Sequence, residues 1–204
     1  HGDQKGLVLP PMIAPIQVVI IPIFKTDSDK QAVLEVVNKI VVQLQDAGVR
    51  VHLDADDHKT PGAKFYTWEL KGVPVRMEIG ARDIANGQAV LVDRLGTGKR
   101  FVALDDITSN VTNLLSEVQT LLFKRASEKR AALWHKEATF TSIAKSMSEK
   151  NGFYQTGWCR SIECETPLKG IQASIRCLLE ESTFVSCFNC DKSSLGDVLI
   201  AKSY

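Results

Sequence analysis

The chain has 204 residues, of which 44% are hydrophobic and 24% charged, values typical of a globular protein with one large domain or two small ones. A formal net charge of +1 excludes a polycation that coats nucleic acid without selectivity. No run of 18 apolar residues occurs, and the opening His-Gly-Asp-Gln-Lys lacks the apolar stretch of a signal peptide. We therefore expect neither a membrane span nor a leader, and function must come from local sites.

Charge is distributed unevenly along the chain. Residues 1–58 contain 5 Lys and Arg against 8 Asp and Glu, whereas residues 59–100 contain 8 against 4. A locally basic segment in a neutral chain suits a confined contact with a polyanion, and an ordinary solvated surface gives the same composition. The charge pattern alone leaves both interpretations open.

The first quarter of the chain predicts a strand, a helix and a second strand. Residues 16–23 are β-branched and nearly continuous, which indicates a buried strand. Apolar residues at helical spacing over 27–47 predict a helix that ends at Gly48, and residues 49–53 alternate as a second strand. Such a unit predicts two parallel strands joined by a right-handed crossover.

The remaining chain continues this alternation and then changes character. Thr60 followed by Pro61 is a helix start signal, because threonine caps the first turn and proline suits its first position. The further elements are a helix over 62–71, a strand over 73–79, a hairpin over 90–104 and helices over 105–130 and 140–150. Short strands and cysteines follow residue 152, so we expect a domain boundary near 126–138.

All five cysteines lie in the last 46 residues. Four of them form two closely spaced pairs, Cys159 with Cys164 and Cys187 with Cys190. Two such pairs can supply a tetrahedral set of thiolates for zinc, and four protein ligands leave no open position, so this zinc would be structural. Incidental core cysteines or a redox pair are the alternatives. Cys177, between Ile175 and Leu178, is interpreted as a buried thiol.

Aromatic and charged residues gather in the segment 60–83. Those placed by helix and strand spacing near one helix–strand–loop corner are Phe65, Glu69, Arg76, Arg82 and Asp83, and Glu78 shares the strand face of Arg76. An aromatic ring, guanidinium groups and carboxylates suit unstacked guanine bases, which present acceptors at O6 and N7 and donors at N1 and N2. Core aromatics with surface ion pairs are the other interpretation, and we prefer it for Trp68.

Three stretches of the chain resemble the class II prolyl-tRNA synthetase family. Residues 2–22 resemble the end of motif 3 and the strand that follows, and residues 64–83 resemble the anticodon-binding domain. The cysteine pairs and the ending 201–204 resemble the zinc-containing extension of the archaeal and eukaryotic type, which some bacteria also have. The family fold is α/β: an anticodon-binding domain with a mixed five-stranded sheet and flanking helices, followed by a small α+β zinc-binding domain.

The resemblance implies a domain order and an activity. We expect the tail of a class II catalytic domain at 1–15, the anticodon-binding domain at 16–125 and the zinc-binding domain at 126–204. The family ligates proline to tRNA(Pro), and ATP, Mg²⁺ and proline bind a catalytic domain that would lie upstream of His1. The 204 residues alone are thus expected to be inactive in aminoacylation, to bind tRNA and their own catalytic domain, and to be monomeric, whereas the full-length cytoplasmic enzyme is expected to be a homodimer.

The resemblance also implies roles for individual residues toward the two guanines shared by proline anticodons. Phe65 stacks, Glu69 and Asp83 accept hydrogen bonds from guanine N1 and N2, Arg76 donates to guanine acceptors, and Lys64 and Arg82 contact phosphate. The four paired cysteines become zinc ligands and Cys177 does not. Ala81 stands where close relatives often carry proline, which leaves the loop before Asp83 less rigid.

Two alternatives remain beside this function. One is a non-catalytic, anticodon-binding-like accessory protein, and the other is a zinc-dependent protein-interaction module that keeps only the fold. His52 and His58 near three aspartates could suggest a second metal site, but we interpret that cluster as a solvated loop.

Overall fold

The computed structural model describes residues 1–203, so the expected family ending at Tyr204 lies outside the described residues. The chain divides into two compact units, His1–Lys124 and Arg125–Tyr204. Each unit has its own sheet and its own hydrophobic core. No helix within residues 1–203 combines the length and the apolar character needed to cross a membrane.

The first unit is built on a five-stranded sheet in the order β4-β3-β5-β6-β7. Its strands are β3 (Val18–Ile23), β4 (Val51–Leu53), β5 (Val75–Gly80), β6 (Gln88–Asp93) and β7 (Lys99–Ala103). β3 runs parallel to both β4 and β5, whereas β6 and β7 continue the sheet in antiparallel fashion. The expected mixed five-stranded sheet and the expected parallel pairing of the first two strands are therefore confirmed.

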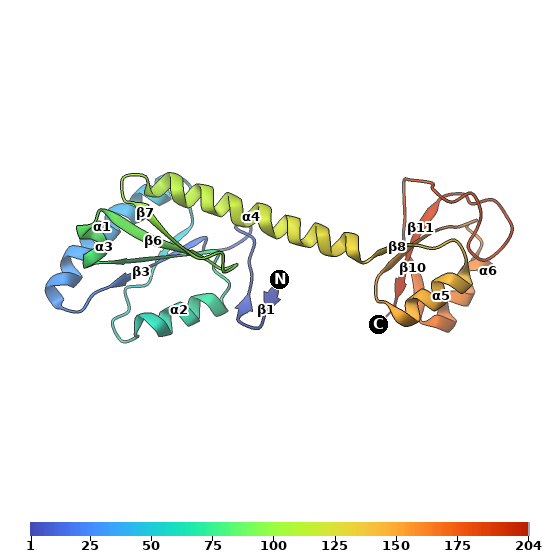
Figure 1. The fold of residues 1–204 in the computed structure, drawn as a ribbon, viewed down its shortest axis with the longest axis horizontal. Coiled ribbons are helices and arrows are strands. Elements are labelled where there is room, and N and C mark those ends of the chain that lie inside the picture. Colours follow the sequence, from blue (N-terminus) through green and yellow to red (C-terminus); the bar gives the residue numbers. More distant parts are fainter. Residues whose placement is uncertain (204) are drawn as a thin grey trace. The chain divides into compact units, whose positions relative to one another are not determined.

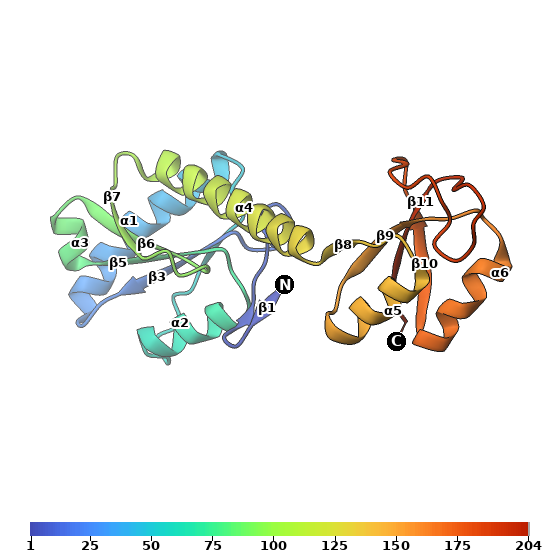
Figure 2. The ribbon, with the colours of Figure 1, turned by 45° about the vertical axis from the view of Figure 1, so that its right-hand side comes forward.

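Helices cover both faces of this sheet (Figures 1 and 2). They are α1 (Asp27–Asp46), α2 (Pro61–Leu70), α3 (Ala81–Ala85) and α4 (Ile107–Ala132). In both views α1 and α4 lie on one face and α2 on the other. The main core lies under α1 and α4, and a smaller apolar cluster joins α2 to the opposite face.

Alternation along β5 assigns its side chains to these two faces. Val75, Met77 and Ile79 are fully buried in the main core. Because successive strand residues point to opposite faces, Arg76 and Glu78 project toward the side that α2 covers. This division follows the alternation of apolar and charged residues in the sequence.

A short hairpin at the start of the chain packs against the end of α2. It consists of β1 (Gly2–Asp3) and β2 (Gly6–Leu7). A Cβ atom on Gly6 would lie 2.5 Å from the carbonyl oxygen of Leu70, and one on Gly72 would lie 2.6 Å from the backbone of Leu7. Both glycines also have positive φ angles, so the close approach of the two backbones requires glycine at both positions.

The second unit has a four-stranded sheet in the order β10-β11-β9-β8. Its elements are β8 (Trp134–Lys136), α5 (Phe140–Glu149), β9 (Phe153–Gly157), α6 (Ile162–Glu165), the 3₁₀ helix η1 (Thr166–Ile171), β10 (Ala173–Leu178) and β11 (Asp197–Lys202). β8 and β9 are parallel and α5 connects them, whereas the other pairings are antiparallel. This small α+β arrangement agrees with the expected fold class.

Candidate functional site

The corner between α2 and β5 is fixed by the signals at the two ends of α2. The Thr60 hydroxyl accepts a hydrogen bond from the amide of Ala63, and Pro61 occupies the first turn. Trp68 is buried and its indole nitrogen donates to Asp54 Oδ2 at 2.7 Å, which confirms its interpretation as a core residue. Phe65, Trp68 and Glu69 of this helix all line a cavity.

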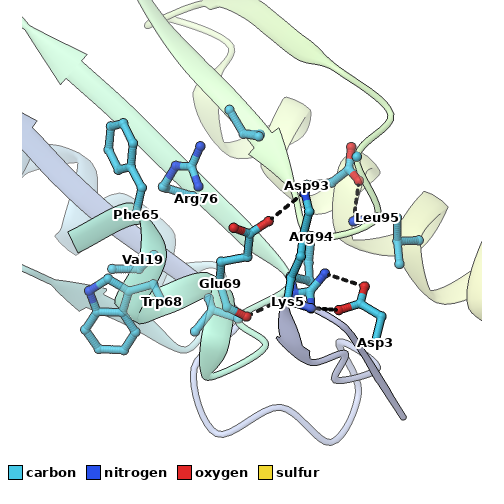
Figure 3. A pocket seen from close by; sticks show the side chains of 13 residues that line it. Asp3, Lys5, Val19, Phe65, Trp68, Glu69, Arg76, Asp93, Arg94 and Leu95 are labelled. Atoms are coloured by element: carbon cyan, nitrogen blue, oxygen red, sulfur yellow. Dashed lines mark hydrogen bonds and ion pairs between the residues drawn. The ribbon is translucent and has the colours of Figure 1, made fainter. Parts of the chain in front are cut away.

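This cavity has a volume of about 420 Å³ and lies entirely within the first unit (Figure 3). Its lining residues come from the N-terminal hairpin, α2, β3, β5 and the end of β6, and its polar members are Asp3, Lys5, Glu69, Arg76, Asp93 and Arg94. Three are basic and three acidic, so their formal charges cancel. A cavity of this kind suits a polar, uncharged group with both donors and acceptors better than it suits a phosphate.

Phe65 and Arg76 contact each other at the wall of this cavity. The Arg76 guanidinium carbon lies over the Phe65 ring, 4.2 Å from its centroid, which is a cation–π contact. The two side chains stand next to each other in Figure 3. An aromatic face and a planar guanidinium together can stack on a base and donate to acceptors along its edge.

The N-terminal hairpin supplies another wall, and Lys5 meets Glu69 there, with 3.3 Å between its Nζ and Glu69 Oε1. Arg94 is buried and donates to both carboxylate oxygens of Asp3, at 2.6 and 3.0 Å, and to the backbone carbonyl of Glu69. Hydrogen bonds from this guanidinium lower the pKa of Asp3 to about 2. These contacts hold the hairpin beside the end of α2.

Sequence reasoning missed this wall of the cavity. It considered the hairpin only through the resemblance of residues 2–22, and it did not single out Lys5 or Arg94. The two glycines that allow the hairpin to pack on α2, Gly6 and Gly72, are visible in the sequence. Their contacts join segments that are distant in the chain, so the sequence did not show that they belong together.

Arg82 and Asp83 lie at the other end of β5, which corrects the expected single corner. They belong to α3 and line a separate cavity of about 280 Å³ together with Phe24 and Lys25. Four strand residues separate Arg76 from Gly80 at the end of β5, which at about 3.4 Å per residue is roughly 14 Å, and Arg82 lies beyond that end, in α3. Asp83 Oδ2 also accepts a hydrogen bond from the Gly80 amide, so one of its oxygens is engaged at the start of α3.

Lys64 also differs from its prediction. We expected it to contact phosphate, but only 3% of its side chain is exposed. Its ammonium group donates to the backbone carbonyl of Asp54 at 2.9 Å and lies 3.5 Å from the carboxylate of the same residue. The phosphate contact is therefore wrong for Lys64, because its charge is used to hold α2 to the loop after β4.

The four paired cysteines meet in the second unit. Their sulfur atoms all lie within 4.8 Å of one another, with 3.6 Å between Cys159 and Cys164 and 3.8 Å between Cys159 and Cys190. In a tetrahedral zinc site with Zn–S bonds of about 2.3 Å, neighbouring sulfurs are about 3.8 Å apart. The four thiols thus fit a metal ion, and within residues 1–203 they are the one such group of His, Cys, Asp or Glu side chains.

The fifth cysteine, Cys177, was expected to be a buried thiol, and this expectation is wrong. Cys177 is exposed on β10, where the pairing with β11 is interrupted by an irregularity between Ile175 and Cys177. The irregularity shifts the alternation that the neighbouring apolar residues suggested.

Comparison with known proteins decides the family. Residues 17–114 match the model of an anticodon binding domain, and residues 140–204 match the model of the C-terminal domain of prolyl-tRNA synthetase. The chain belongs to the prolyl-tRNA synthetase family. It contains the anticodon-binding and C-terminal domains of that family.

Relatives from three organisms illustrate the match. The chain is 38% identical over its whole length to a proline–tRNA ligase of Cenarchaeum symbiosum and 41% identical to one of Alkaliphilus oremlandii, of which it covers 43% and 42%. It also matches the crystal structure of prolyl-tRNA synthetase from Cryptosporidium parvum complexed with L-proline and AMP, at 34% identity and a TM-score of 0.90, covering 100% of this chain and 44% of that one. The chain thus spans less than half the length of these members of the family.

Proposed function

We propose that this chain is the anticodon-reading and C-terminal part of a cytoplasmic proline–tRNA ligase. The 204 residues bind tRNA(Pro), while ATP, Mg²⁺ and proline bind a catalytic domain in the remaining length that the relatives have. In this proposal residues 1–15 are the tail of that catalytic domain, 16–125 read the anticodon, and 126–204 bind zinc. The longer enzyme acts as a homodimer, and the 204-residue chain is monomeric.

The observation that carries the proposal is the cation–π contact between Phe65 and Arg76 at the wall of a cavity that Glu69 also lines. Phe65 stacks on an anticodon guanine, Arg76 donates to its O6 and N7, and Glu69 accepts from its N1 and N2 hydrogens. The O6/N7 acceptors and the N1/N2 donors of the base then each have a partner of the correct polarity.

Arg82 and Asp83 form a second contact site for the RNA in this proposal. Because they lie at the far end of β5, they meet a different nucleotide from the one held by Phe65 and Arg76. Arg82 contacts phosphate there, and Asp83 offers the oxygen that Gly80 leaves open.

The second unit binds one structural zinc ion through Cys159, Cys164, Cys187 and Cys190. The sulfur–sulfur distances support this assignment, and four thiolates leave no position for substrate. The ion would link the segment of Cys159 and Cys164 to the segment of Cys187 and Cys190, in a unit whose apolar core is small.

Binding to a proline anticodon stem-loop tests the proposal. The intact chain is titrated with this RNA and with a stem-loop in which both shared guanines are replaced, at several salt concentrations. Phosphate contacts alone give a slope of about −0.7 per contact and no discrimination between the two RNAs. We expect a clear preference for the guanines that Arg76→Ala abolishes. Equal binding of both RNAs by the unaltered chain would refute anticodon reading and favour a protein-interaction module.

A further inference from the structure

Glu78 lies next to Arg76 on the same face of β5, and its carboxylate is buried. Glu78 is only 6% exposed, so the alternative of an ordinary surface ion pair with Arg76, which the sequence had left open, does not describe it. A buried carboxylate is costly unless its oxygens are paired and hydrogen-bonded. The contacts of Glu78 therefore constrain its neighbours as well as itself.

The two oxygens of Glu78 have different partners. Oε1 accepts from Arg76 Nε at 3.0 Å and from Arg76 Nη2 at 2.9 Å. Oε2 accepts from Lys99 Nζ at 3.1 Å, across the sheet from β7. Lys99 thus occupies the second oxygen and leaves the first to the guanidinium.

This arrangement determines which edge of Arg76 is available to a ligand. A guanidinium has a side edge formed by Nε and Nη2, and an end edge formed by Nη1 and Nη2. Glu78 takes the side edge. The ring of Phe65, whose centroid is 4.2 Å from the guanidinium carbon, contacts the same guanidinium.

We infer that Glu78 is a positioning residue for base reading, which holds Arg76 so that its end edge meets O6 and N7 of a guanine. The inference rests on the proposed function and adds to it the group that orients the reading side chain. Arg76 cannot turn away without leaving a buried carboxylate short of a partner, so it is oriented before RNA binds. Preorganised donors discriminate more strongly than mobile ones, because less side-chain freedom is lost on binding.

The test measures how far binding depends on guanine N7. Each anticodon guanine of the proline stem-loop is replaced in turn by 7-deazaguanine, which lacks only the N7 acceptor. For the unaltered chain we expect the replacement at one position to weaken binding about tenfold or more, as for a lost hydrogen bond to a charged donor. In Glu78→Met, which has a similar shape and no acceptor, the same replacement should weaken binding less than about threefold.

A conservative variant separates positioning from a merely structural role. Glu78→Gln keeps one oxygen that can accept from Arg76, so its N7 dependence should lie between those of the unaltered chain and Glu78→Met. If Glu78→Met does not fold, Glu78→Gln is judged alone, and an N7 dependence smaller than that of the unaltered chain supports the inference. Glu117→Gln is the matched control, since it breaks an exposed ion pair with Arg100 in the same unit and should leave the N7 dependence unchanged.

The outcomes distinguish the inference from the function on which it rests. If Arg76→Ala binds the stem-loop as well as the unaltered chain does, the proposed function fails, and the inference fails with it. If Arg76→Ala weakens binding but the folded Glu78 variants keep the full N7 dependence, only the positioning role of Glu78 is overturned.

Discussion

Arg94 and Asp3 are 91 residues apart in sequence, yet the guanidinium of one donates to both carboxylate oxygens of the other. Arg94 also donates to the carbonyl of Glu69, so a single buried side chain joins the start of the chain, α2 and the end of β6. Asp3, Lys5 and Arg94 line the proposed base-binding cavity, so the N-terminal hairpin is part of the site.

The Asp3–Arg94 pair should make stability depend on acidic pH. Hydrogen bonding to Arg94 lowers the folded-state pKa of Asp3 from 3.8 to about 2, so its contribution is present above pH 3.8 and is lost as pH falls through that range toward 2. The difference in free energy of unfolding between the unaltered chain and Asp3→Asn should be constant near neutral pH and shrink between about pH 4 and pH 2. Urea unfolding of both proteins measures it. Asp105→Asn, which removes an exposed carboxylate in the same unit, is the control. A difference in unfolding free energy between the unaltered chain and Asp3→Asn that stays constant down to pH 2 would contradict the prediction.

Gly72→Ala should detach the N-terminal hairpin from α2. The new methyl group would lie 2.6 Å from the Leu7 backbone, and φ is +73°, so steric overlap adds to backbone strain. Gly87→Ala is the matched control, because its φ is +64° and nothing lies within 4 Å of the added carbon. We expect the control to lose roughly 1 kcal/mol of unfolding free energy and Gly72→Ala clearly more. Hydrogen exchange at residues 1–7 should accelerate only in Gly72→Ala, and equal behaviour of the two variants would argue against tight docking.

Phe65→Leu should weaken binding of the proline stem-loop by about 1–3 kcal/mol, the usual contribution of one base stacked on an aromatic ring. The Phe65 side chain is only partly buried, so the fold should persist. Tyr66→Leu is the control, since Tyr66 is the next residue of α2 and is 64% exposed outside the cavity. Fluorescence anisotropy with labelled RNA gives both affinities. Equal losses in the two variants would move the stacking site away from the cavity.

Removal of zinc should unfold residues after about 152 and leave the anticodon-binding core intact. Zinc binding contributes about 10–16 kcal/mol in zinc-finger peptides at pH 7, enough to decide whether so small a unit folds. A chelator should therefore abolish hydrogen-exchange protection of β9, β10 and β11 while β3 and β5 stay protected. Protection of both regions to the same degree would refute this prediction.

We expect Asp197 to hold in place the loop that carries Cys187 and Cys190. Its buried carboxylate accepts hydrogen bonds from Gln155 and from the amides of Thr183 and Phe184, at 2.7 to 3.1 Å. Asp197→Asn replaces an acceptor with a donor and should destabilise the second unit by about 1–3 kcal/mol. Competition with a zinc chelator should show weaker metal retention than in Asp191→Asn, an exposed substitution on the same loop. Equal zinc retention in the two variants would show that the hydrogen bonds of Asp197 do not affect the metal site.

Several features of this protein follow from the sequence by itself. The apolar run at 16–23, the helical spacing after it and the Thr60–Pro61 start signal are local, and local spacing decides which residues become strand or helix. The alternation along β5 likewise determined that Arg76 and Glu78 share a face. The two cysteine pairs indicated a metal centre, because the members of each pair are only five or three residues apart in the sequence.

Only the tertiary structure decided which of these residues act together. Phe65 and Arg76 meet because α2 packs on the face of the sheet from which Arg76 projects, whereas Arg82 lies in α3, beyond the far end of β5, and lines a different cavity. Burial places Lys64, an expected phosphate contact, in a structural ion pair, and it decides that the Arg76–Glu78 pair is a buried one and not a surface one. Spacing along a chain fixes direction within one element, but distance and burial depend on packing between elements, and that packing places Asp3 and Lys5 beside Glu69.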